Sequence, residues 1–240
     1  MIFKAWQKTS LIEFPGKLST VLFTGGCNFR CPFCYNASLV LAPAVIPDLP
    51  GDTVLAYLRD HRRLYQAAVI TGGEPTLQGE LPAFLESLKS LGFLTGLETN
   101  GSRPGLLGSL LTEGLVDFVA ADVKGPLEAR SYCKAAAPTE DASQVVEAVL
   151  DSLDLLGAAA GPLVEVRCTV VPGLHSPADL RRLAKQLAER GLPRLVLQQF
   201  RPQEALDPAL RDREPYSGEL LAKQQRRLER LGLECTLRGV

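Results

Sequence analysis

The chain contains 240 residues, and its 26 lysines and arginines are nearly balanced by 27 acidic residues. A chain of this length can bury a substantial core, and the charge balance indicates neither a basic nucleic-acid-binding surface nor attraction to anionic membranes. The first residues lack a signal peptide's apolar segment, and no apolar run reaches the ~18 residues of a membrane-spanning helix, so we expect a cytoplasmic protein without nucleic-acid or membrane partners.

The predicted elements begin with a short β addition and continue as a series of strand–helix units. Apolar and polar residues alternate near the start of residues 1–19, which is typical of a strand, and we expect this segment to lie antiparallel ahead of the first unit. Strand-like apolar runs occupy residues 19–25, 67–72, 92–99, 116–124, 163–171 and 194–200. Stretches with helical apolar spacing follow them at residues 52–64, 80–91, 103–114, 142–157, 176–191 and 217–232.

These successive strand–helix units favour a parallel sheet with right-handed crossovers. The expected fold class is therefore α/β: a partial (β/α)6 barrel, similar to a TIM barrel, with a short N-terminal β addition. A doubly wound open sheet is the alternative arrangement of the same units. No internal repeat or linker interrupts the sequence, which predicts one domain over residues 1–240, and the apolar, proline-rich residues 39–50 predict a loop packed over the site.

Three cysteines lie close together, at Cys27, Cys31 and Cys34, with no fourth cysteine or histidine close behind. In a reducing compartment, such clustering indicates metal binding or catalysis rather than disulfides. A structural zinc ion normally takes four ligands, so a small zinc site needs a distant fourth residue. A [4Fe-4S] cluster held by three thiolates keeps one iron open for chemistry, and Phe33 could shield one of its faces. The remaining cysteines are far apart and are expected to be core thiols: Cys133, Cys168 and Cys235.

Two further motifs suit a ligand site. Gly72, Gly73 and Glu74 end the second predicted strand, where glycines let the backbone approach a ligand closely; an ordinary strand-to-helix turn is the alternative. In the fifth strand, Arg167 alternates with apolar residues. It therefore points either into the polar lumen of a barrel or, from an edge strand, into water.

The other polar residues also follow predicted strands. Asp122 and Lys124 share one face of the fourth strand by the two-residue period, and Asn100 follows the third strand. A charged strand end and a simple turn are the alternatives for these residues. The carboxyl ends of successive predicted strands, where parallel barrels place their active sites, carry the cysteine loop and the segments GGEP, LETNG, DVK, VVPGLH and QQFRP. The sequence therefore predicts one site at that end of the barrel.

The sequence CNFRCPFCYN, in which an aromatic residue precedes the last cysteine, resembles the radical S-adenosylmethionine superfamily. The likeness extends in the same order to AVITGGEPTLQ, LETNG, VDFVAADVKGPL, VRCTVVPGLHSPADL and QQFRP, and covers most of the chain. Together these segments are most similar to the glycyl-radical-enzyme activases, and among them to the activating proteins of anaerobic ribonucleotide reductase. Tyr35 departs from the pattern, because these activases usually have histidine after the third cysteine.

The resemblance implies a role for each site residue. The three clustered cysteines bind a [4Fe-4S] cluster, and the backbone of the Gly-Gly-Glu turn receives the amino group of S-adenosylmethionine. Arg167 contacts the cofactor's ribose or carboxylate, Val170 packs beside adenine, and His175 is a further candidate. A monovalent cation is expected at Glu98, Thr99 and Asp122, although such proteins more often have aspartate where Glu98 stands. The remaining residues expected around the cofactor are Phe33, Asn100 and Lys124.

The resemblance implies the activity of a radical S-adenosylmethionine activase. An electron from the reduced cluster cleaves S-adenosylmethionine, and the resulting 5′-deoxyadenosyl radical abstracts a Cα hydrogen from a glycine of a glycyl radical enzyme, here anaerobic ribonucleoside-triphosphate reductase. A flavodoxin- or ferredoxin-type protein is the expected electron donor. The alternatives are a small-molecule reaction such as 7-carboxy-7-deazaguanine synthesis, modification of another protein, and a zinc-binding interaction module.

Overall fold

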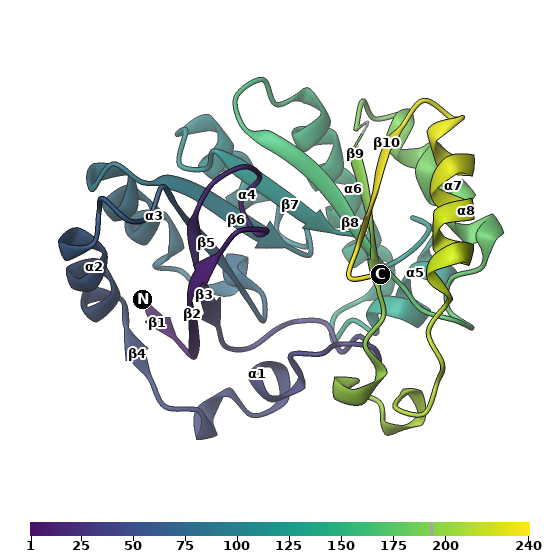
Figure 1. Cartoon of the computed structure of the whole chain (residues 1–240), viewed down its shortest axis with the longest axis horizontal. Coiled ribbons are helices and arrows are strands. Elements are labelled where there is room, and N and C mark those ends of the chain that lie inside the picture. The colour runs from purple at the N-terminus through teal and green to yellow at the C-terminus, as the bar shows by residue number, and fades with distance from the viewer. Residues whose placement is uncertain (193) are drawn as a thin grey trace.

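The fold is built on one curved sheet, shown in Figure 1. The computed structural model describes residues 1–192 and 194–240. The strands of the sheet are β2 (Ala5–Ser10), β3 (Ser19–Thr24), β5 (Ala67–Gly72), β6 (Leu94–Thr99), β7 (Phe118–Asp122), β8 (Leu163–Val170), β9 (Arg194–Gln199) and β10 (Glu234–Arg238). Their spatial order is β10-β9-β8-β7-β6-β5-β3-β2, in which β2 is antiparallel to β3 and every other neighbouring pair is parallel.

Helices cover the outside of this sheet (Figure 1). They are α2 (Gly51–Asp60), α3 (Leu81–Ser90), α4 (Pro104–Thr112), α6 (Ala142–Ala158), α7 (Pro177–Ala188) and α8 (Gly218–Glu229), with the shorter α1 (Ala37–Leu41) and α5 (Ala129–Ala136) in loops. A separate two-stranded antiparallel sheet pairs β1 (Ile2–Phe3) with β4 (Leu49–Pro50). Within the described part of the chain, every helix is too short or too polar to cross a membrane.

The structure confirms the predicted fold class, a partial α/β barrel with an antiparallel N-terminal addition. The predicted strands correspond to β3, β5, β6, β7, β8 and β9, and β10 adds a parallel edge strand that the sequence analysis did not predict. Only Cys235 among its five residues is fully buried. A strand this short, with one buried side chain, has only a weak apolar pattern, so it could not be predicted from the sequence.

Side-chain caps fix where several helices begin. α7 starts after Ser176, whose hydroxyl accepts the N–H of Asp179, while the Asp179 carboxylate accepts the N–H of Ser176 in return. Asp141 and Ser217 cap α6 and α8 with their own side-chain oxygens. These helices follow β7, β8 and β9, so the caps restrain the loops that leave the carboxyl ends of those strands.

The two faces of the sheet bury different sets of side chains. On the outer face, Leu22, Ile70 and Leu97 belong to the main hydrophobic core with the helices. On the inner face, a small apolar cluster includes Val69 and Phe118. Phe14, from the loop between β2 and β3, joins this inner cluster and lies 5.4 Å from Phe118 between ring centroids. That loop lies at the amino ends of the parallel strands because β2 is antiparallel, so Phe14 fills that end of the lumen.

The same loop connects the two edges of the sheet, β2 and β10. Glu13, next to Phe14, is 3.1 Å from Arg167 on β8 and 3.3 Å from Arg238 on β10. Arg238 also lies 3.4 Å from Glu165 on β8. Strand pairing does not join β2 to β10 in the described structure. Ion pairs therefore bridge the open side of the barrel at its amino end.

Replacing Leu22 with alanine should destabilise the protein far more than the same change at Leu11. Leu22 on β3 is fully buried, whereas Leu11 is 75% exposed. Removing a buried leucine side chain costs about 2–5 kcal/mol of the free energy of unfolding, and a surface change stays within about 0.5 kcal/mol. Thermal unfolding followed by circular dichroism under anaerobic conditions measures both. Equal melting midpoints for Leu22→Ala and Leu11→Ala would contradict this assignment of the core.

Candidate active site

One cavity lies at the carboxyl ends of the parallel strands. Its empty space is about 850 Å³, a volume that includes solvent at its open mouth. The predicted site residues that line it are Cys27, Cys31, Phe33, Cys34, Gly72, Gly73, Glu74, Glu98, Thr99, Asn100, Asp122, Lys124 and Arg167. Val40, from the apolar segment 39–50 that was expected to pack over the site, also lines the cavity. The other lining residues, to which the sequence alone assigns no role, are Glu13, Phe29, Tyr35, Asn36, Thr71, Thr169 and Gln198. Val170 and His175 are buried behind the cavity wall.

The cysteine loop leaves β3 and lies against the end of α5. Arg30 donates its backbone N–H to the carbonyl of Ala136 at 3.1 Å. Its guanidinium Nη1 donates to the Cys27 carbonyl at 2.6 Å. Within the loop, the N–H of Cys34 donates to the carbonyl of Cys31 at 3.0 Å. Main-chain hydrogen bonds and the Arg30 side chain therefore restrain the cysteine loop.

The three thiols are buried or half-buried at the cavity. Burial raises the pKa of Cys31 to about 12, and it also raises the pKa values of Cys27 and Cys34. The thiols therefore stay protonated near neutral pH unless a metal group stabilises the thiolates. Among the described residues, no three cysteine, histidine or acidic side chains are placed to hold a single metal ion. A four-iron cluster does not require such convergence, because each thiolate binds a different iron, and the donor set of three thiols fits it.

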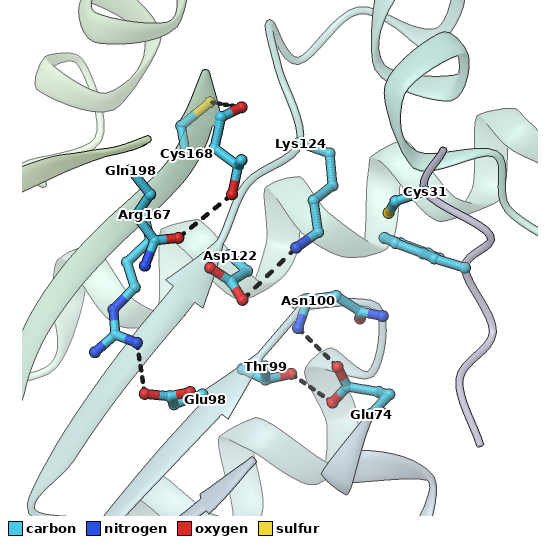
Figure 2. A network of polar contacts seen from close by, with 12 residues as sticks. Cys31, Glu74, Glu98, Thr99, Asn100, Asp122, Lys124, Arg167, Cys168 and Gln198 are labelled. Carbon is cyan, nitrogen blue, oxygen red and sulfur yellow. Dashed lines mark hydrogen bonds and ion pairs between the residues drawn. The ribbon is translucent and has the colours of Figure 1, made fainter. Parts of the chain in front are cut away.

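The Gly-Gly-Glu turn after β5 is tied to the cysteine loop and to β6. A Cβ on Gly73 would lie 1.8 Å from the carbonyl oxygen of Gly26, so only glycine fits there. Glu74 donates its N–H to that same carbonyl at 2.8 Å. Its buried carboxylate accepts hydrogen bonds from the Thr99 hydroxyl and the Asn100 N–H, both at 2.7 Å (Figure 2). The turn therefore links the ends of β3, β5 and β6.

Asn28 makes a second link between the cysteine loop and the end of β6. Its Oδ1 accepts from Nδ2 of Asn100 at 3.0 Å, and its Nδ2 donates to the Ser102 hydroxyl at 2.9 Å. Its carbonyl accepts the N–H of Thr139 at 2.9 Å. The sequence analysis gave Asn28 no role. The available signal was its position directly after Cys27, where an amide side chain can hydrogen-bond to the neighbouring loop.

A buried ion cluster forms the amino-terminal side of the cavity. Arg167 is 2% exposed, and its Nη1 lies 2.5 Å from Glu98 and 3.1 Å from Glu13 (Figure 2 shows the Glu98 pair). Its Nε lies 2.6 Å from Glu165. Within the described structure, its buried Nη2 has no hydrogen-bond partner. This unpartnered donor beside the cavity suits an anionic or hydroxyl-bearing ligand. The sequence does not predict the role of Glu13, because its partner Arg167 lies 154 residues further along the chain.

Lys124, two residues after the end of β7, adds another charged side chain to the cavity lining. Its Nζ lies 3.6 Å from Oδ2 of Asp122 (Figure 2). Burial has the largest single effect on the pKa of Lys124 and lowers it, but Asp122, Cys31, Tyr132 and Cys34 together raise it, so that the net shift is upward. The carbonyl of Lys124 lies 2.8 Å from Nε2 of His175. His175 thus reaches the main chain of the cavity wall, whereas Val170 belongs to the hydrophobic core.

Comparisons with known proteins identify the class to which this fold and site belong. The Radical SAM superfamily model matches residues 21–187. A protein of Methanocaldococcus jannaschii with the provisional name glycyl-radical enzyme activating enzyme is 34% identical over 200 residues, which cover 82% of this chain and 79% of that protein. The 7-carboxy-7-deazaguanine synthase of Methanopyrus kandleri is 29% identical over 183 residues, covering 60% of this chain and 72% of that enzyme.

Solved structures share the fold at low sequence identity. The crystal structure of QueE from Escherichia coli aligns over 99% of this chain and 91% of its own, with a TM-score of 0.54 and 16% identity. SuiB of Streptococcus suis bound to S-adenosylmethionine aligns with a TM-score of 0.68 and 13% identity. That alignment covers 91% of this chain, which spans only about half (52%) of the SuiB chain.

The chain belongs to the radical SAM superfamily. It is a radical SAM enzyme related to proteins named as glycyl-radical enzyme activating enzymes. Its cofactors are those of the family, a [4Fe-4S] cluster and S-adenosylmethionine.

Replacing Gly73 with alanine should impair cluster retention, while Gly79→Ala should not. The new methyl group at position 73 would collide with the main chain of Gly26 and push the cysteine loop away from the Gly-Gly-Glu turn. Gly79 has open space around its Cβ position, which makes it a matched control. We expect Gly73→Ala to retain less than about half of the wild-type iron, because main-chain atoms cannot yield to the overlap. Iron analysis after anaerobic gel filtration measures this, and equal iron in both variants would contradict the proposed packing.

Proposed function

We propose that this protein is an activase that removes a hydrogen atom from a glycine Cα of a partner enzyme and leaves a glycyl radical there. The observation that carries the proposal is the apolar rim of the cavity, which we define as Tyr35, Leu41 and Val45. These side chains are 55%, 57% and 80% exposed, respectively. Apolar side chains exposed together at the mouth of a site mark a surface for another macromolecule.

The segment that carries the rim begins at the cavity. Tyr35 itself lines the cavity, as do Asn36 and Val40 on the same segment. Leu41 ends α1, and Val45 ends the single 3-10 turn that follows it. A peptide segment that packed its apolar side chains on this rim would therefore bring a neighbouring glycine over the cavity. The name carried by the relative from Methanocaldococcus jannaschii supports the same activity.

Within this class, we infer that the partner is an anaerobic ribonucleoside-triphosphate reductase. The support is the sequence resemblance, which spans the cysteine loop and the segments at the successive strand ends. A flavodoxin- or ferredoxin-type protein is the proposed electron donor. When bound, the reduced cluster and S-adenosylmethionine supply the electron and the 5′-deoxyadenosyl radical with which radical SAM enzymes remove hydrogen atoms.

The chain's own residues would hold these groups in place. The cysteine loop would provide the three thiolates through Cys27, Cys31 and Cys34, and leave one iron for the methionine end of S-adenosylmethionine. The Gly-Gly-Glu turn offers backbone positions that come close to a ligand for lack of a Cβ. Arg167 would donate its unpartnered Nη2 to the cofactor's ribose or carboxylate. Phe33 and Asn100 would complete the wall near the cluster.

Val170 and His175 are assigned a different part in this proposal. Neither lines the cavity, and both are buried directly behind its wall. We therefore propose that they support the cavity wall rather than touch adenine or ribose. His175 would do so through its contact with the Lys124 carbonyl.

A small-molecule reaction of the 7-carboxy-7-deazaguanine synthase kind is the second candidate function. The observation that favours it is the 29% identity to the Methanopyrus kandleri enzyme, 72% of which is covered. For that function, the apolar rim would have no role in the substrate complex. Charged substitutions on the rim would then leave turnover unchanged, which separates the two candidates.

Replacing Cys27, Cys31 or Cys34 with alanine should abolish cluster binding and the reductive cleavage of S-adenosylmethionine. Each change removes one of only three thiolates at the cavity, and the iron that it held would lose its protein ligand. Iron analysis and the visible absorption of the anaerobically reconstituted protein measure the loss.

The matched controls are alanine variants of the other cysteines: Cys133, Cys168 and Cys235. None of these lines the cavity, so their iron content should equal that of the wild type. Loss of the cluster from any single one of the controls would overturn the ligand assignment.

The reduced protein, mixed anaerobically with S-adenosylmethionine and the reductase of its own organism, should generate a glycyl radical detectable by electron paramagnetic resonance. The signal should vanish when the radical-bearing glycine of the reductase is changed to alanine. A Val45→Asp variant of the activase should reduce the yield at least about tenfold, because a buried unpaired carboxylate opposes docking. It should leave uncoupled cofactor cleavage unchanged. Competent cleavage without a radical on any glycyl radical enzyme of that organism would defeat the proposal.

A further inference from the structure

The predicted ligands of a monovalent cation already have other partners in this protein. Oε1 of Glu98 accepts from the Arg167 guanidinium at 2.5 Å. The Thr99 hydroxyl donates to Glu74 at 2.7 Å, and its oxygen accepts the N–H of Gly101 at 3.1 Å. A bound cation needs several oxygen atoms free to point at one position. The residues of this site do not fit that requirement.

The third predicted ligand, Asp122, is paired with the ammonium group of Lys124. Its Oδ2 lies 3.6 Å from the Lys124 ammonium, and both side chains line the cavity. This ion pair favours the charged form of the half-buried lysine. An additional ion beside Asp122 would meet the repulsion of this ammonium.

The backbone carbonyl of Lys124 also has a hydrogen-bond partner. Nδ1 of His175 accepts the N–H of Val171 at 3.0 Å, so the proton of the neutral imidazole lies on Nε2. Nε2 then donates to the Lys124 carbonyl at 2.8 Å. His175 is itself held by Tyr216, whose hydroxyl donates to the His175 carbonyl at 2.9 Å. Lys124 is therefore restrained through its main chain as well as through Asp122.

We propose that Lys124 is a built-in cation that takes the place of a bound monovalent ion, so that S-adenosylmethionine binds without any requirement for K⁺ or Na⁺. Asp122 orients the ammonium, and His175 fixes the strand end that carries it. The ligand that this charge receives is a carboxylate-bearing cofactor. The inference concerns cofactor binding alone and holds for either candidate function of the site.

The test measures S-adenosylmethionine binding to the iron-loaded holoenzyme under anaerobic conditions. The buffers have equal ionic strength and contain K⁺, Na⁺ or tetramethylammonium, which is too bulky for an ion site. The dissociation constant should agree within about threefold among the three buffers. Binding that is more than about threefold tighter in K⁺ or Na⁺ than in tetramethylammonium would overturn the proposal. Neither result bears on the glycyl-radical experiment, so the two proposals can fail separately.

Two substitutions show whether Lys124 supplies the charge. Lys124→Met removes the ammonium and keeps the stem, so binding in tetramethylammonium should weaken at least about tenfold and recover partly in K⁺ or Na⁺. Lys124→Arg retains a cation and should stay indifferent to the salt. The exposed Lys134 on α5 provides the control, and Lys134→Met should bind as the wild type does. Wild-type binding by Lys124→Met in every buffer would contradict the proposal. If Lys124→Met fails to retain iron, the salt dependence of cofactor binding by the wild type and by Lys124→Arg still tests the proposal.

Discussion

The carboxylate of Glu74 is the contact on which the arrangement of the site depends. It is fully buried and joins two strand ends, because it accepts hydrogen bonds from Thr99 and Asn100. The backbone N–H of the same residue holds the cysteine loop through Gly26. Burial raises the pKa of Glu74, and its hydrogen bonds oppose that rise. Glu74 thus sets the position of the cysteine loop relative to the carboxyl ends of β5 and β6.

Local sequence features predicted most of this site because parallel strands place their carboxyl ends together. The cysteine spacing, the Gly-Gly-Glu turn and Lys124 each stand at the end of a recognisable apolar run, so finding the runs also located the motifs. The same reasoning could not find Glu13. Its partner Arg167 lies more than half of the chain away, and no periodicity relates a loop residue to a strand across a lumen.

Two further features of the structure could not be predicted from the sequence, for a similar reason. β10 is defined by its pairing with β9, and its own residues are too few to produce a clear alternating pattern. The family resemblance made His175 a candidate cofactor contact, and the hydrogen bonds of its ring could not be read from the sequence. Its ring hydrogen-bonds to the Val171 N–H and the Lys124 carbonyl, and only the three-dimensional positions of those backbone groups reveal this. Hydrogen bonds between loops are specified by the packed structure rather than by local spacing.

Because Phe14 fills the amino end of the lumen, the cofactor and a partner protein would bind in a fixed order. That ring packs against Phe118 at the amino end of the lumen, and the cavity lies at the carboxyl ends of the strands. A macromolecule seated on the apolar rim would cover the mouth of that cavity and whatever lies below it. The cofactor would then have to bind before the partner protein. Its cleavage products would leave only after the partner protein dissociates. For such an enzyme, the lifetime of the protein–protein complex sets an upper limit on the rate of repeated turnover.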